Sequence, residues 1–207
     1  GEARAAPHGG GKRRPIREGD IVLLDGGCNV DGDRSDISRT VVGGTPTTRQ
    51  REIWDLVKRG QAAAFAAAKL GAACEDVDAA PRKVYAEFGF GPDYKLPGLP
   101  HRTGHGIGMD GHEWTNLVSG NKTTRAHGIV FSTEPMVVLP GEVAVRIAAR
   151  TCMTERGARR FKPPTPTVAR QGGGEGPRWP RARRGGVPSG TSRGRTGHGA
   201  VSERRAG

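Results

Sequence analysis

The sequence is organised around residues 101–113, which read His101-Arg102-Thr103-Gly104-His105-Gly106-Ile107-Gly108-Met109-Asp110-Gly111-His112-Glu113. Half of the six histidines in the 207-residue chain fall within this stretch, separated by glycines. Neutral imidazole is the commonest metal ligand in proteins and a proton carrier near neutral pH, and glycines beside it let a backbone or a substrate approach closely. The stretch therefore indicates a metal or catalytic site, provided that carboxylates elsewhere in the chain complete it.

Residues 20–42 are predicted to form a β-hairpin. The apolar run at residues 21–24 is typical of a buried strand. Asp31-Gly32 is typical of a two-residue type I′ turn, because both central residues of that turn need positive φ. Residues 37–42 supply the returning strand.

The register of this hairpin brings two carboxylates together. If the turn is as predicted, Asp25 lies opposite Ser38, and Asp36 lies on the same face because side chains two residues apart share a face. Asp25 and Asp36 are then diagonal neighbours. Two like charges on one buried face should raise the pKa of one of them, and a divalent cation between them would remove this conflict. The alternative interpretation is that both are solvent-facing acids of a turn.

Two helices are predicted after the hairpin. Residues 47–71 have apolar side chains at helical spacing, with Thr47 or Thr48 as the N-cap and Gly71 as the stop. A second helix is predicted over residues 75–88, in which Pro81 is expected to cause a kink or a split. Both helices have the pattern of structural elements and not of sites.

Two further strands are predicted near the C-terminal end. Residues 128–133 form one strand and deliver Glu134, and residues 142–147 form another. These β segments do not alternate regularly with the helices, and the chain has no phosphate-binding glycine loop. The sequence therefore predicts the α+β class and not a doubly wound parallel sheet.

The composition fits one domain with a tail. The formal net charge is +12, and half of it lies in residues 171–207, whose Arg, Gly, Ser and Pro content predicts disorder. Nucleic-acid binding by this tail is disfavoured, because Trp179 is the only aromatic residue among its basic ones. The three isolated cysteines fit a reducing compartment, and no apolar run is long enough for a transmembrane helix. We therefore expect a cytoplasmic protein without a membrane partner.

The combined motifs resemble the metal-dependent aminopeptidases with the pita-bread fold, the family of methionine aminopeptidase, prolidase and Xaa-Pro aminopeptidase. The residues that carry the resemblance are Asp25-Gly26-Gly27, Ser35-Asp36-Ile37-Ser38-Arg39-Thr40, residues 101–108, His112-Glu113 and Phe131-Ser132-Thr133-Glu134-Pro135. The pattern of residues 101–113 looks most like the Xaa-Pro peptidase branch. The resemblance implies a pita-bread catalytic domain over residues 1–166, incomplete at its N-terminus, and an Arg/Gly-rich tail over residues 167–207.

The resemblance also implies an activity and a set of roles. It implies hydrolysis of the bond between an N-terminal residue and proline by metal-activated water, so the substrate would be a peptide with proline at its second position. The implied metal ligands are Asp25, Asp36, His105 and Glu134. The implied catalytic residues are His8 and His101 in the substrate pocket, His112 beside the tetrahedral intermediate, and Glu134 as the proton carrier. Oxygen and imidazole ligands favour Mn, with Co, Fe or Zn as alternatives.

Three departures from the family pattern affect these expectations. The family has a bridging glutamate in a strand where this chain has Ala148, so the second metal site should be weakened and activity should be low. Asp33 stands where the family usually has tyrosine. The chain begins late in the fold, and the apolar surface exposed by such a truncation would favour association, for example into a homodimer. The alternatives are an inactive member that binds a peptide or protein, or a different hydrolase or lyase reaction on the same scaffold.

Overall fold

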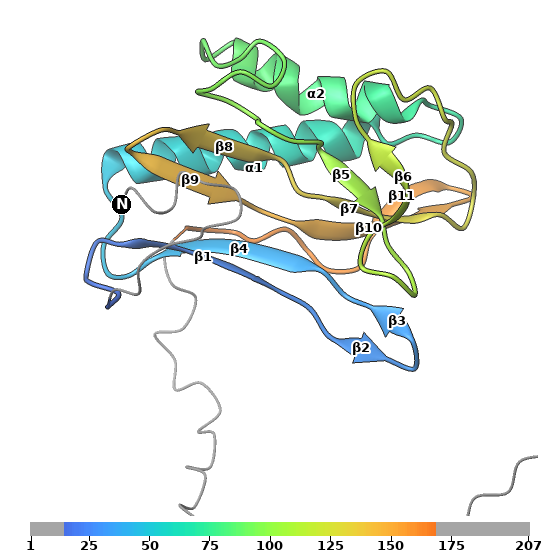
Figure 1. The fold of residues 1–207 in the computed structure, drawn as a ribbon, viewed down its shortest axis with the longest axis horizontal. Coiled ribbons are helices and arrows are strands. Elements are labelled where there is room, and N and C mark those ends of the chain that lie inside the picture. The colour runs from blue at the N-terminus through green and yellow to red at the C-terminus, as the bar shows by residue number, and fades with distance from the viewer. Residues whose placement is uncertain (1–14, 169–207) are drawn as a thin grey trace, which may run out of the picture. The chain divides into compact units, whose positions relative to one another are not determined.

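The computed structural model describes residues 15–168, so His8 and residues 169–207 lie outside the described range. The predicted boundary between a domain and a tail at residue 166 therefore stays a prediction. The elements, labelled in Figure 1, are β1 (Ile21–Gly26), β2 (Asn29–Val30), β3 (Asp33–Arg34), β4 (Ile37–Val42), α1 (Thr48–Ala67), α2 (Cys74–Ala86), β5 (Gly104–Gly106), β6 (Glu113–Leu117), β7 (Val130–Thr133), β8 (Met136–Leu139), β9 (Val143–Arg146), β10 (Ala149–Thr154) and β11 (Gly157–Arg160).

The predicted hairpin is confirmed with its register. Strand β1 pairs antiparallel with β4 so that Asp25 lies opposite Ser38, and β2 pairs with β3. Asp31 and Gly32 have φ of 52° and 97°, as a type I′ turn requires. This turn fixes the register and therefore places the segment that carries Asp36 beside the end of β1.

Helix α1 begins at the predicted cap. The Thr47 side chain accepts a hydrogen bond of 3.1 Å from the backbone N–H of Gln50, whose side chain in turn accepts one from the Thr47 N–H. The helix ends at Ala67, earlier than the predicted Gly71. Its apolar stripe is buried as expected, with Ile53, Leu56, Val57, Ala64 and Ala68 each at most 3% exposed.

Helix α2 runs without a break through Pro81, so the prediction of a split is wrong. Pro81 lies on the buried face of the helix, where packing outweighs the loss of one backbone hydrogen bond. Gly89 follows the helix with φ of 77°, in agreement with the predicted stop. Neither helix of residues 15–168 combines the length and the apolar composition that crossing a bilayer requires.

A five-stranded antiparallel sheet in the order β11-β10-β7-β5-β6 forms the centre of the fold. The predicted strands at residues 128–133 and 142–147 correspond to β7 and β9, whereas β5, β6, β8, β10 and β11 were not predicted. Strand β8 pairs with β9 in a separate hairpin. Figure 1 shows both helices on one side of the strands and the β1–β4 hairpin on the other.

Two apolar clusters hold these layers together. One joins α1 to the β1–β4 and β8–β9 hairpins and includes Trp54 and Val145. The other joins the C-terminal half of α1 and α2 to the five-stranded sheet and includes Val77 and Phe131. The strand β5 contacts β6 and β7, and β9 contacts both α1 and the β1–β4 hairpin. The packing therefore fixes three separate segments, the hairpin, β5 and the end of β7, relative to one another.

The close approach of β5 to β7 depends on Gly104. A Cβ at this position would lie 2.0 Å from the backbone carbonyl oxygen of Ser132. We expect Gly104→Ala to displace β5 and to lower the free energy of unfolding by about 3 kcal/mol, at the upper end of the usual cost of overpacking. Chemical denaturation measures this change. Gly26→Ala is the matched control, because a Cβ there meets no atom within 4 Å, and equal stability of the two variants would contradict the expectation.

Candidate metal centre

Three side chains from three different elements converge on one point. Asp36 lies between β3 and β4, His105 lies in β5, and Glu134 directly follows β7. One ligand atom of each lies within 4.8 Å of the others. The Nε2 atom of His105 is 3.3 Å from an oxygen of Asp36 and 3.3 Å from an oxygen of Glu134. These are three of the four residues for which a metal-ligating role was expected.

His105 is held in the orientation that a metal ligand needs. Its side chain is fully buried, and Nδ1 lies 2.9 Å from the carbonyl oxygen of Gly106. A hydrogen bond from Nδ1–H to that carbonyl leaves the lone pair on Nε2, which is the usual arrangement of metal-bound histidine. The Nε2 atom makes no aligned hydrogen bond in the described structure. A buried imidazole nitrogen that faces two carboxylates fits a divalent cation.

The carboxylates and the imidazole shift one another's pKa values. The His105 imidazole beside Asp36 lowers the pKa of that carboxyl, against the opposing effect of partial burial. Burial disfavours the charged imidazole, but Asp36 and Glu134 together outweigh it and raise the pKa of His105 to about 9. The prediction of a raised pKa from repulsion between Asp25 and Asp36 is wrong for Asp36, because a histidine lies next to its carboxylate.

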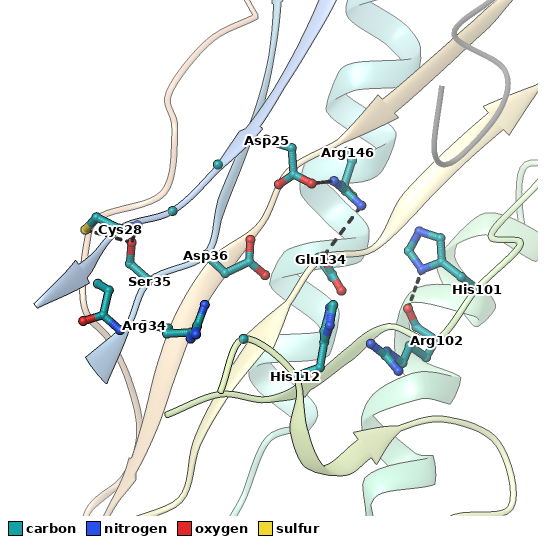
Figure 2. Close-up of a pocket in the computed structure, with 14 residues that line it drawn as sticks. Asp25, Cys28, Arg34, Ser35, Asp36, His101, Arg102, His112, Glu134 and Arg146 are labelled. Carbon is teal, nitrogen blue, oxygen red and sulfur yellow. Dashed lines mark hydrogen bonds and ion pairs between the residues drawn. The ribbon is translucent and has the colours of Figure 1, made fainter. Parts of the chain in front are cut away.

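Asp25 is paired in a way that the sequence did not predict. Its carboxylate forms an ion pair with Arg146 and accepts a hydrogen bond of 2.6 Å from the Ser38 hydroxyl. Arg146 is only 8% exposed, and its other terminal nitrogen lies 3.8 Å from Glu134. Figure 2 shows the guanidinium between these two carboxylates. The one available signal was proximity in the sequence, since Arg146 lies two residues before Ala148.

A cavity of about 910 Å³ opens over these residues. Asp25, Asp36 and Glu134 line it together with Arg146 and with both predicted pocket histidines of the described range, His101 and His112. Figure 2 shows Asp36, Glu134 and His112 pointing into the same space. Two arginines that were not assigned a role, Arg34 and Arg102, also line this cavity.

The two pocket histidines have different environments. His112 packs edge-on against the His105 ring with 4.3 Å between ring centroids. Partial burial and the neighbouring His105 lower the pKa of His112. Burial also lowers the pKa of His101, whose Nδ1 lies 2.6 Å from the Arg102 carbonyl oxygen. Both imidazoles are therefore neutral near pH 7, so each keeps one N–H to donate.

Ala148 lies where a further carboxylate was expected, and its methyl group offers no ligand. The residue is fully buried and its backbone is firmly held. Its N–H donates to the Ser38 carbonyl at 3.2 Å, and its own carbonyl accepts a bond of 2.7 Å from Arg39. The neighbouring Ile147 carbonyl accepts a bond of 2.7 Å from the buried Gln61. The described residues thus offer three ligands for one ion but no complete set for a second.

Comparison with known proteins identifies the family. Residues 1–155 match metallopeptidase family M24. The chain belongs to this family. It is 37% identical over 161 residues to an Xaa-Pro dipeptidase of Pyrococcus furiosus, a match that covers 78% of this chain and 45% of that protein. It is 42% identical over 155 residues to a probable dipeptidase PepE of Mycobacterium tuberculosis, covering 74% of this chain and 40% of that one.

Solved structures of M24 proteins share the fold. A dipeptidase from Pyrococcus horikoshii superposes with a TM-score of 0.75 at 35% identity, covering 81% of this chain and 46% of that one. The prolidase from Pyrococcus furiosus gives 0.69 at 37% identity, covering 75% and 45%. The fold is thus the pita-bread fold of family M24, as predicted, and the chain spans less than half the length of these relatives.

Metal binding to this M24 centre should release a proton. Because the pKa of His105 is raised to about 9, its imidazole is charged in the metal-free protein near neutral pH, whereas a ligand must be neutral. We expect release of about one proton per ion at about pH 7.5, measured by calorimetry in buffers of different ionisation enthalpy. Metal affinity should rise with pH up to about 9. Binding without proton release at this pH would contradict the prediction.

The raised pKa of His105 also affects the stability of the metal-free protein. The folded pKa of His105 lies above its ordinary value of 6.5, so protonation favours the folded state. This contribution is fully present below about pH 6.5 and is lost as the pH rises through about 9. Thermal unfolding with a chelator present, compared between the natural protein and His105→Gln, isolates it.

Proposed function

We propose that this chain carries the metal-binding half of an Xaa-Pro peptidase, a hydrolase that cleaves the bond between an N-terminal residue and proline. The observation that carries the proposal is the buried Nε2 of His105 facing the carboxylates of Asp36 and Glu134 within 4.8 Å. The cavity beside them is large enough for a dipeptide. The similarity to proteins named Xaa-Pro dipeptidase supports this substrate class.

The residues of the centre divide the chemical work. A divalent ion held by Asp36, His105 and Glu134 would supply Lewis acidity and lower the pKa of water. The Glu134 carboxylate accepts the proton of the attacking water and passes it to the leaving amine. The neutral His112 donates its N–H to the oxygen of the scissile carbonyl as negative charge develops there. Arg146 holds Asp25 and faces Glu134, and so limits the movement of both carboxylates.

We propose one ion per chain and low activity, because Ala148 provides no ligand at the second position. Mn remains the metal that we expect, with Co, Fe or Zn as alternatives. The predicted roles of His8 and of Asp25 as a metal ligand, the cytoplasmic location and a homodimer stay predictions. The proposal also includes a substrate with proline at its second position and a weakened second metal site.

A single substitution tests the proposal. The backbone at position 148 is held by Ser38, Arg39 and the Gln61 contact to its neighbour, so Ala148→Glu should place a carboxylate there without rearranging the chain. We expect at most one tightly bound divalent ion in the natural protein and two in Ala148→Glu. Elemental analysis after purification counts the ions, and an Xaa-Pro dipeptide assay should show at least a tenfold gain in turnover in the variant, about 1.4 kcal/mol of transition-state stabilisation.

The matched control is Ala149→Glu, which adds the same carboxylate one residue further along. Ala149 is the first residue of β10 and lies opposite Thr133, whereas Ala148 lies in the break between β9 and β10, so we expect this variant to keep the metal content and turnover of the natural protein. If neither the natural protein nor Ala148→Glu retains metal, the proposal of a metallohydrolase fails for this chain. Equal gains in metal content and turnover in Ala148→Glu and Ala149→Glu would contradict a specific role for position 148.

A second candidate function is peptide or protein binding without catalysis. The observation that favours it is the fully buried methyl group of Ala148 in place of a ligand. Binding of a proline-containing dipeptide that persists in excess chelator, with no turnover in any variant, would support this function. Loss of dipeptide binding on chelation would support the metallohydrolase.

A further inference from the structure

A buried carboxylate on helix α2 contacts the segment that leads into β5. Asp78 is 1% exposed and lies in α2, a helix for which the sequence pattern indicated a structural role and no functional site. Its Oδ1 accepts a hydrogen bond of 3.0 Å from the Thr103 backbone N–H and one of 2.7 Å from the Thr103 hydroxyl. A buried carboxylate is costly unless it is fully paired. Here the pairing extends to the residue before β5.

The partner of Asp78 on the helix binds the same segment. Arg82 donates to Asp78 Oδ2 at 2.8 Å through Nε. Its terminal nitrogens donate to the carbonyl oxygens of Leu99 at 3.0 Å and His101 at 2.8 Å. The Arg82 guanidinium also lies 4.1 Å from the centre of the Tyr94 ring. The Asp78–Arg82 ion pair on α2 thus makes hydrogen bonds to Leu99, His101 and Thr103, every second residue of one short segment.

This segment has little other support for its conformation. Within the described part of the chain, the backbone groups of residues 99–102 make no hydrogen bonds to other backbone groups. Irregular backbone that is buried must satisfy its polar groups from side chains or water. For Leu99 and His101 the side chain is Arg82 of α2, whereas the Arg102 carbonyl lies 2.6 Å from Nδ1 of His101. Backbone pairing holds the two ends of the segment, through the Gly98–Val138 bridge and a 3.0 Å hydrogen bond from the Thr103 N–H to the Leu117 carbonyl. Between these ends, Arg82 binds the backbone at Leu99 and His101, and Asp78 shares the Thr103 N–H with Leu117.

The same segment carries or supports the residues of the metal centre. His101 and Arg102 line the cavity, and His105 lies two residues after Thr103. The Thr103 carbonyl also accepts a hydrogen bond of 2.8 Å from the backbone N–H of Glu134. Thr103 thus contacts α2 through its N–H and hydroxyl and contacts a metal-ligating residue through its carbonyl.

We infer that Asp78 and Arg82 are positioning residues, which hold the wall of the cavity and set the placement of His105 and Glu134 from behind. They touch neither the ligand atoms nor the cavity. Second-layer contacts of this kind change metal affinity by about 10- to 100-fold when they are removed. The inference rests on the proposed metal function for its effect on affinity, whereas its effect on the backbone is independent of any metal.

The first test therefore uses the metal-free protein. Asp78→Asn removes the charge, and Thr103→Val removes only the hydroxyl contact and leaves the Asp78–Arg82 pair intact. Val77→Ala is the matched control. Val77 is a fully buried residue of the same helix, and it packs in the apolar cluster that joins the helices to the five-stranded sheet. Amide hydrogen exchange by NMR should be about tenfold or more faster at Thr103 and Glu134 in Asp78→Asn, and less so in Thr103→Val. Exchange in β10, which pairs with β11, should stay unchanged.

The control distinguishes positioning from general stability. Val77→Ala should accelerate the slowly exchanging amides of the whole domain together, through global unfolding. The inference is overturned if exchange at Thr103 and Glu134 in Asp78→Asn changes no more than exchange in β10. If Asp78→Asn does not fold, Thr103→Val decides by the same comparison.

The second test uses Co²⁺ as a spectroscopic probe of the centre. We expect Asp78→Asn to bind Co²⁺ about tenfold or more weakly than the natural protein and to shift its visible absorption bands, whereas Val77→Ala keeps both the affinity and the bands. Unchanged affinity and bands in Asp78→Asn overturn the effect on the centre. If the natural protein binds no Co²⁺, the proposed metal function fails, and the exchange measurement alone decides whether Asp78 and Arg82 position the segment.

Discussion

The His105 imidazole, buried between the carboxylates of Asp36 and Glu134, is the constraint on which the rest of the described structure depends. The three side chains come from the hairpin, from β5 and from the end of β7, so the layers must bring distant segments within hydrogen-bond range. Gly104 permits this because its missing side chain lets β5 approach the backbone of β7. Two carboxylates this close would repel each other, and the positive charge that separates them is supplied by the imidazole.

Support for this centre comes from both of its sides. On the cavity side, Arg146 pairs with Asp25 and faces Glu134. On the helix side, Asp78 and Arg82 hold the segment that enters β5. Asp78, Arg82 and Arg146 are buried or partly buried and each is paired, as burial of a charge requires, whereas Asp25 is exposed. The fold therefore places ion pairs in front of and behind the three candidate ligands Asp36, His105 and Glu134.

The sequence predicted the parts of the site that depend on local signals. The Asp31-Gly32 turn and the apolar run at residues 21–24 were enough for the register that places Asp25 opposite Ser38. The five-stranded sheet could not be predicted, because β10 and β11 lack a long apolar run and contain arginines that pack on neighbouring rings. The Asp25–Arg146 pair joins residues 121 positions apart, and no local pattern encodes such a contact. The role of Asp78 was not predicted either, because a carboxylate on a helix is usually exposed to solvent.

Charge balance supports the proposal of one ion and not two. Asp25, Asp36 and Glu134 contribute three negative charges, Arg146 contributes one positive charge, and His105 is neutral when it binds metal. One divalent cation makes this set neutral. A second one would leave two uncompensated positive charges in a partly buried centre, beside the arginines that line the cavity, at a high electrostatic cost. A glutamate at position 148 would remove one of those charges as well as supply the missing ligand, so its effect on the second ion is electrostatic as much as geometric.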